Sequence, residues 1–74
     1  MKIGLKDYSQ ICKDYHEIDN TLCNGEQWLL FEDDLDGEDA PCIAVNLTKK
    51  YYVYTEESLR YTVDNLDEFE MYSL

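Results

Sequence analysis

The sequence predicts a single α+β domain spanning residues 1–74, with the element order α-β-β-β-α and a three-stranded antiparallel sheet packed by helices. Apolar residues recur at spacings of three and four near both ends of the chain, which is typical of helices. Three short apolar runs fill the middle, joined by short links that favour antiparallel pairing. With 45% hydrophobic residues, a chain of 74 residues holds one small core.

Residues 5–22 are predicted to form an amphipathic helix. Its apolar stripe consists of Leu5, Tyr8, Ile11, Cys12, Tyr15, Ile18 and Leu22. Asn24-Gly25 follows directly, and both residue types readily take the left-handed conformation that ends a helix.

Three strands are predicted next, at residues 27–32, 42–47 and 51–54. The first two are bulky apolar runs, and the third is rich in aromatic and β-branched residues. Pro41 fits the first position of a strand, where its missing N–H is tolerated.

A second helix is predicted from Thr55, as its N-cap, to about Met71. Leu59, Val63, Leu66 and Phe69 supply its buried stripe, and Arg60 has acids four residues away on either side. We expect both helices on one face of the sheet. The predicted core is Trp28, Leu29, Leu30, Phe31, Ile43, Val45, Val53, Leu59, Val63, Leu66 and Phe69.

The net charge of −11 is the most unusual property of the chain. Residues 32–39 carry six carboxylates and no base, and residues 55–74 carry six acids against one arginine. Such a charge opposes binding to nucleic acid phosphates and to anionic membranes. It favours a basic partner, whereas the simpler alternative is an acidic surface that only aids solubility.

Three kinds of chemical site receive little support. Glu32, Asp34, Asp36 and Gly37 match the first half of a calcium-binding EF-hand loop, but Ile43 stands where the closing acid belongs. Cys12 and His16 are four residues apart on the predicted helix, without a third group to orient them. The cysteines lack the paired spacing of a zinc site. We therefore expect no enzyme, metal or cofactor.

Cys12, Cys23 and Cys42 cannot all pair within one molecule, and residues 1–4 show no signal peptide. No apolar run approaches the length of a membrane span. The expected location is the cytoplasm, with reduced thiols.

In size, acidity and predicted element order, the chain resembles small phage-encoded DNA-mimic inhibitors, among them anti-CRISPR proteins, anti-restriction proteins and acidic inhibitors of uracil-DNA glycosylase. The resemblance covers the whole chain but rests on composition and architecture, without a shared motif. It implies a non-enzymatic inhibitor that blocks the nucleic-acid-binding site of a basic protein, such as a Cas nuclease, in a bacterial host cell. The predicted partner-binding residues are Glu32, Asp33, Asp34, Asp36, Glu38, Asp39, Glu57, Asp64, Asp67 and Glu68.

Two other functions stay open: an immunity or antitoxin-like protein that neutralises one toxin through an acidic patch, and an adaptor whose acidity is incidental. Tyr51, Tyr54, Tyr61 and Tyr72 could anchor an interface or pack in the fold. The chain is expected to be a monomer or a homodimer, because a small open sheet leaves an edge for strand pairing.

Overall fold

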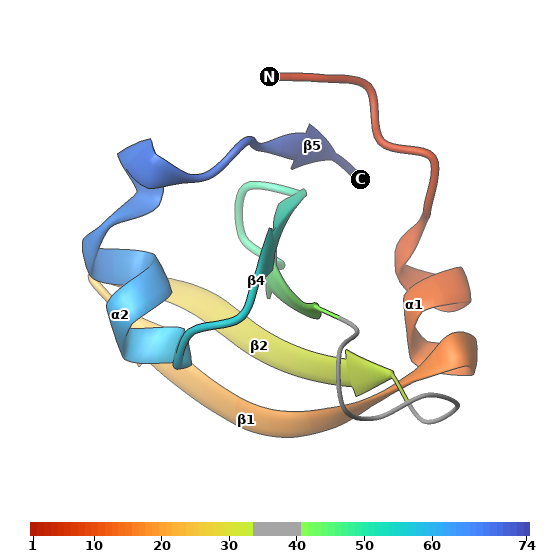
Figure 1. Cartoon of the computed structure of the whole chain (residues 1–74), viewed down its shortest axis with the longest axis horizontal. Helices are drawn as coiled ribbons and strands as arrows, with labels where there is room; N and C mark the ends of the chain where they lie inside the picture. Colours follow the sequence, from red (N-terminus) through yellow and green to blue (C-terminus); the bar gives the residue numbers. More distant parts are fainter. Residues whose placement is uncertain (34–40) are drawn as a thin grey trace.

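A computed structural model of the chain describes residues 1–33 and 41–74. Five strands form one antiparallel sheet in sequential order: β1 (Tyr15–Cys23), β2 (Glu26–Asp33), β3 (Cys42–Asn46), β4 (Tyr51–Thr55) and β5 (Tyr72–Ser73). Two helices, α1 (Tyr8–Asp14) and α2 (Leu59–Asp64), and a 3₁₀ turn, η1 (Leu66–Glu68), complete the described chain (Figure 1). The α+β class is confirmed, whereas the predicted three-stranded sheet and five-element order are incomplete.

The prediction of one long helix over residues 5–22 is wrong. Asp7 accepts a hydrogen bond from the Gln10 amide at 2.8 Å and caps the short helix α1, which ends at Asp14. The chain then extends into β1 and turns back into β2 through Asn24-Gly25, whose φ angles are 53° and 79°. Positive φ at both central residues is what a two-residue hairpin turn requires, so this dipeptide joins two strands.

The two helices cover opposite faces of the sheet, which corrects the expectation that they share one face. Ile11 of α1 packs with Leu29 and Phe31, whereas Leu59 of α2 packs with Trp28 and Leu30. Successive residues of a strand point to opposite faces. Strand β2 therefore presents an α1 face and an α2 face, and its continuous apolar run fits burial on both sides.

The second helix is shorter than predicted and begins later. Ser58 is its N-cap and accepts from the Tyr61 amide at 3.2 Å, a role that the sequence had suggested for Thr55. Thr55 instead lies at the end of β4, where its hydroxyl accepts from the Glu57 amide at 3.0 Å and contacts the buried Thr62 hydroxyl at 2.8 Å. Helix α2 ends at Asp64, and the chain continues through η1 to β5.

The first residues of the chain extend the sheet past β5. Lys2 forms a parallel bridge with Tyr72, donating its amide to Met71 O at 2.9 Å and accepting from the Ser73 amide at 2.8 Å. Both ends of the described chain therefore lie beside each other (Figure 1).

Most of the predicted core is confirmed. Trp28, Leu29, Leu30, Phe31, Ile43, Val45, Val53 and Leu59 are buried, while Val63, Leu66 and Phe69 are partly buried against the α2-face cluster. Ile11, Ala44, Tyr51 and Tyr52 are also buried. The remaining stripe of the predicted first helix is not core, since Leu5 and Leu22 are 96% and 68% exposed.

Candidate partner-binding surface

The ends of β2 and β4 lie at the same end of the sheet. Cys42 pairs with Thr55, and the Glu32 charge acts on the Cys42 thiol, whose pKa is raised by burial and then by that charge. Glu32 shares the α2 face with Trp28 and Leu30, because strand residues alternate. The charge at the end of β2 is thus on the same side of the sheet as α2.

Acidic side chains gather around the exposed ring of Tyr61 on α2. Its hydroxyl donates to the Glu68 carboxylate at 3.1 and 3.3 Å, which ties α2 to η1. The hydrogen bond from Tyr61 to Glu68 raises the pKa of the phenol, and the charges of Glu68, Glu57 and Asp67 raise it further. We call Glu57, Tyr61, Asp67 and Glu68 the Tyr61 cluster.

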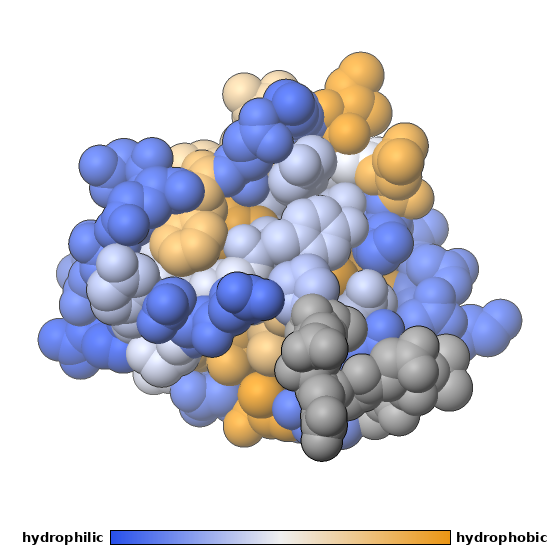
Figure 2. All heavy atoms as spheres, in the orientation of Figure 1, coloured by the Kyte–Doolittle hydropathy of each residue, from blue (hydrophilic) through white to orange (hydrophobic). Residues whose placement is uncertain are grey.

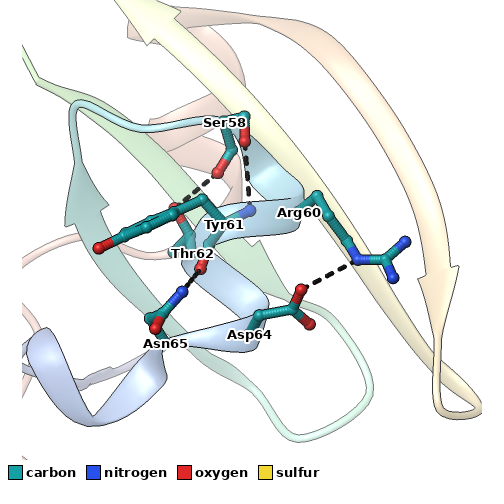
Figure 3. Close-up of polar contacts among 6 residues, drawn as sticks. All are labelled: Ser58, Arg60, Tyr61, Thr62, Asp64 and Asn65. Atoms are coloured by element: carbon teal, nitrogen blue, oxygen red, sulfur yellow. Dashed lines mark hydrogen bonds and ion pairs between the residues drawn. The ribbon is translucent and has the colours of Figure 1, made fainter.

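Asp64 belongs to a different part of the surface. Its carboxylate accepts from Arg60 Nε at 3.1 Å, which confirms that the arginine is held within its own helix. Figure 3 shows this pair extending from the side of α2 opposite the Tyr61 ring. Arg60 and Asp64 there line a hollow with Leu22 and other residues next to the β1–β2 turn.

The predicted contact residues therefore divide into four groups. Glu57, Asp67 and Glu68 come together around Tyr61, and Glu32 lies on the same side of the sheet. Asp33 pairs with Tyr15, whose ring packs against the α1-face cluster, so Asp33 points to the other face. Asp64 is separate, as described above. Asp34, Asp36, Glu38 and Asp39 lie outside the described residues, as does Gly37 of the calcium-type loop.

The basic side chains leave the Tyr61 cluster largely uncompensated. Lys2 pairs with Glu70 at 2.9 Å and Lys49 with Glu26 at 3.4 Å, while Arg60 is held by Asp64. None of the ion pairs found among residues 1–33 and 41–74 includes a member of the cluster. Hydrophilic residues also dominate the left margin of Figure 2, where Figure 1 places α2 and the segment after it.

Tyr61 is the one suggested aromatic anchor that is substantially exposed, at 41%. Tyr51 is buried and meets Trp28 edge to face, with ring centroids 5.6 Å apart. Tyr54 and Tyr72 pack with Tyr52 against the α1-face cluster. The sequence alone does not distinguish the four tyrosines, because their exposure depends on the strand register and on where helix α2 ends.

Cys12 and His16 do not lie on one helix, which was the basis of the suggested pairing. Cys12 lies on α1 and is exposed rather than packed in the core. His16 lies on β1, and its Nε2 is 3.0 Å from Glu32 Oε1. The described part of the chain contains no cluster of histidine, cysteine and acidic residues that could hold a metal ion. Nor does it contain a helix long and apolar enough to cross a membrane.

Comparison of the chain with protein-family models, with curated proteins and with solved structures gives no match.

Proposed function

We propose that the chain is a non-enzymatic acidic inhibitor that occupies the DNA-binding site of a basic nucleic-acid-binding protein. The class of target we propose is a bacterial defence nuclease such as a CRISPR–Cas effector, met in the cytoplasm of the host cell. The Tyr61 cluster is the observation that carries the proposal.

The cluster combines two properties that suit a DNA-reading groove. Duplex DNA presents about one negative charge per 1.7 Å of axis, and its partners answer with lysine and arginine. Glu57 from the link between β4 and α2, and Asp67 and Glu68 from η1, all act by charge on the Tyr61 phenol. Their field would speed the encounter with a basic surface.

Tyr61 adds a contact that charge alone does not provide. An arginine guanidinium can stack on an aromatic face while its N–H groups reach surrounding carboxylates. The Tyr61 ring is held in place because its hydroxyl is bonded to Glu68. An aromatic residue that is held by one carboxylate and lies in the field of two others is therefore a ready acceptor for one arginine of the partner, and such central contacts carry much of the affinity of an interface.

The proposal assigns binding to the Tyr61 cluster rather than to the net charge of the whole chain, so two variants with the same change in net charge test it. Glu57→Lys/Asp67→Lys reverses the Tyr61 cluster, whereas Asp14→Lys/Glu17→Lys makes the same change in net charge on α1 and β1. All four side chains are exposed, and none forms an ion pair within the described residues. Both variants should fold.

The experiment is affinity capture from bacterial lysate with the wild type and both variants, at low and high salt, with and without duplex DNA. We expect a DNA-binding protein that is released by duplex DNA, retained by the α1 and β1 variant, and lost by the cluster variant. A captured partner that duplex DNA does not release would contradict the DNA-mimic proposal and favour the immunity-type function. Equal loss with both variants would show that net charge, not the cluster, governs binding.

A further inference from the structure

The exposed apolar side chains are concentrated on the two edges of the sheet. Seven large hydrophobic residues are exposed in the described chain, and five of them lie on these edges. Met1, Ile3 and Leu5 are 75%, 86% and 96% exposed beside β5, and Ile18 and Leu22 are 46% and 68% exposed on β1. We call residues 1–5 the N-terminal edge and β1 the β1 edge.

The N-terminal edge has backbone groups that face away from the sheet. Both the N–H and the C=O of Lys2 bond to the β5 segment, and the Gly4 amide donates to Ser73 Oγ at 3.3 Å. In an extended chain the groups of alternate residues point to opposite sides, so those of Ile3 point outward. The β1 edge is open as well, since β1 pairs with β2 and with no other strand among the described residues.

The two edges differ in charge. Lys2 and Lys6 flank Ile3 and Leu5, without an acid between them. Lys2 is paired with Glu70 at 2.9 Å, which leaves Lys6 as the lysine at this edge without an ion pair among the described residues. The β1 edge carries Glu17 and Asp19, both exposed. Two β1 edges placed together would oppose like charges, whereas a β1 edge and an N-terminal edge flanked by Lys6 are complementary.

We propose that the β1 edge of one copy pairs with the N-terminal edge of a second copy, head to tail. Figure 1 places these edges on opposite sides of the molecule, so both stay available in every added copy. Hydrophobic residues gather at the upper right of Figure 2, over the N-terminal segment, and at the lower margin in the area of β1. Heterologous contacts of this kind build open chains or closed rings.

The β-bulge between Glu17 and Asp19 fits this arrangement. Bulges and charges on edge strands guard against indiscriminate strand pairing. Here they discourage pairing of two β1 strands but leave Leu22, beyond the bulge, open to an apolar partner. The short interface should be weak. The net charge of −11 also opposes association until salt screens it. At 0.15 M salt the Debye length of about 8 Å is well below the 20 Å smallest extent of the molecule, so the charges on the far side of a partner copy are screened.

Sedimentation of the full chain in 0.15 M salt tests the proposal, over about 10 μM to about 1 mM, the range expected of a weak interface. Two variants block one edge each: Ile3→Thr/Leu5→Thr and Ile18→Thr/Leu22→Thr. Threonine keeps strand propensity while removing the apolar contact. Thermal unfolding verifies that both variants are folded.

We expect the average mass of the wild type to rise with concentration beyond twice that of the monomer. Each variant alone should stay monomeric, and an equimolar mixture should form dimers and nothing larger, because one intact edge of each kind remains. A wild type that stays monomeric throughout would overturn the proposal. So would a single-edge variant that associates as the wild type does, because that result means pairing of like edges.

Discussion

Replacing Gly4 with alanine should release the first residues of the chain from the sheet. A Cβ added at Gly4 would lie 2.0 Å from the Ser73 carbonyl oxygen and 3.0 Å from Tyr52 Cε1. Carbonyl oxygen belongs to the backbone of β5 and cannot turn away as a flexible side chain would. The close approach is therefore possible only without a side chain at position 4.

The cost of the substitution is limited by the cost of detaching the segment. Detachment breaks the two backbone hydrogen bonds between Lys2 and the β5 segment, each worth about 1 kcal/mol net. The exposed Lys2–Glu70 ion pair adds little, because water solvates both groups. The two lost hydrogen bonds bring the estimate to about 2 kcal/mol, within the usual range of about 1–3 kcal/mol for overpacking.

Thermal unfolding followed by circular dichroism should show a Tm lower by roughly 8–16 °C, since about 1 kcal/mol shifts a domain of this size by about 4–8 °C. Hydrogen exchange locates the change. The Ser73 amide, which donates to Lys2 O, should lose protection, while the Leu74 amide, bonded to Lys50 O at 3.0 Å, should keep it.

Gly25→Ala is the matched control. Gly25 has a φ of 79° but no atom within 4 Å of an added Cβ, so its cost of about 1–2 kcal/mol comes from backbone strain alone. That variant should leave the Ser73 amide protected. The reasoning fails if Gly4→Ala melts within about 2 °C of the wild type and Ser73 exchanges as slowly as before.

Three further predictions concern the polar groups of the fold. Thr62→Val should cost about 1–3 kcal/mol in urea unfolding, because it removes a buried hydroxyl that donates to Ser58 O at 2.8 Å and that also contacts the Thr55 hydroxyl. Adding Thr55→Val should cost less than a second independent loss, because the contact between the two hydroxyls is already gone. Glu68→Gln should bring the raised pKa of Tyr61 down toward its ordinary value, as measured by NMR titration of the tyrosine ring carbons. A pKa that is raised in the folded state contributes stability below the unfolded pKa, and this stability is lost as the pH rises through the folded pKa. The wild type should therefore lose more stability than the variant in alkaline solution. Sodium chloride should raise the Tm, because screening relieves the repulsion of eleven net charges and weakens only a few exposed ion pairs. A Tm that falls with salt would mean that the ion pairs contribute more to stability than the repulsion costs.

The sequence predicted the three central strands because each is a continuous run of bulky or β-branched residues. Their observed bounds differ from the predicted ones by at most one residue at either end. The same runs also indicate which faces of the sheet are covered. Strands that are apolar at every position, such as Trp28–Phe31, require cover on both faces, which excludes two helices on one side.

The first helix was overextended for a physical reason. Strand β1 lies at an edge and is largely exposed, so it shows no alternation of apolar and polar residues. The bulge between Glu17 and Asp19 also shifts the register by one residue, which leaves Tyr15, Ile18 and Leu22 at helical spacings. Asn24-Gly25 is the one local signal for a hairpin, but the same dipeptide also fits the end of a helix.

The geometry of the candidate surface depends on a break in the second helix, which the apolar spacing does not indicate. Leu59, Val63, Leu66 and Phe69 keep helical spacing, yet the helix ends at Asp64 and the chain turns through η1. Both segments still cover the α2 face, so hydrophobic burial does not distinguish a continuous helix from a broken one. The break matters for charge, because it brings Glu68 within hydrogen-bonding distance of the Tyr61 hydroxyl.

The placement of the acids follows from the way the core is built. Because both faces of the central strands are covered, carboxylates are left for strand ends, the β1 edge, and the outer sides of α2 and η1. Of the described bases, Lys2, Lys49 and Arg60 are each held by an acid away from Tyr61. Glu57, Asp67 and Glu68, whose charges act on the Tyr61 phenol, are in none of the ion pairs of the described residues. A basic partner that binds there would relieve repulsion within the free protein as well as form new contacts.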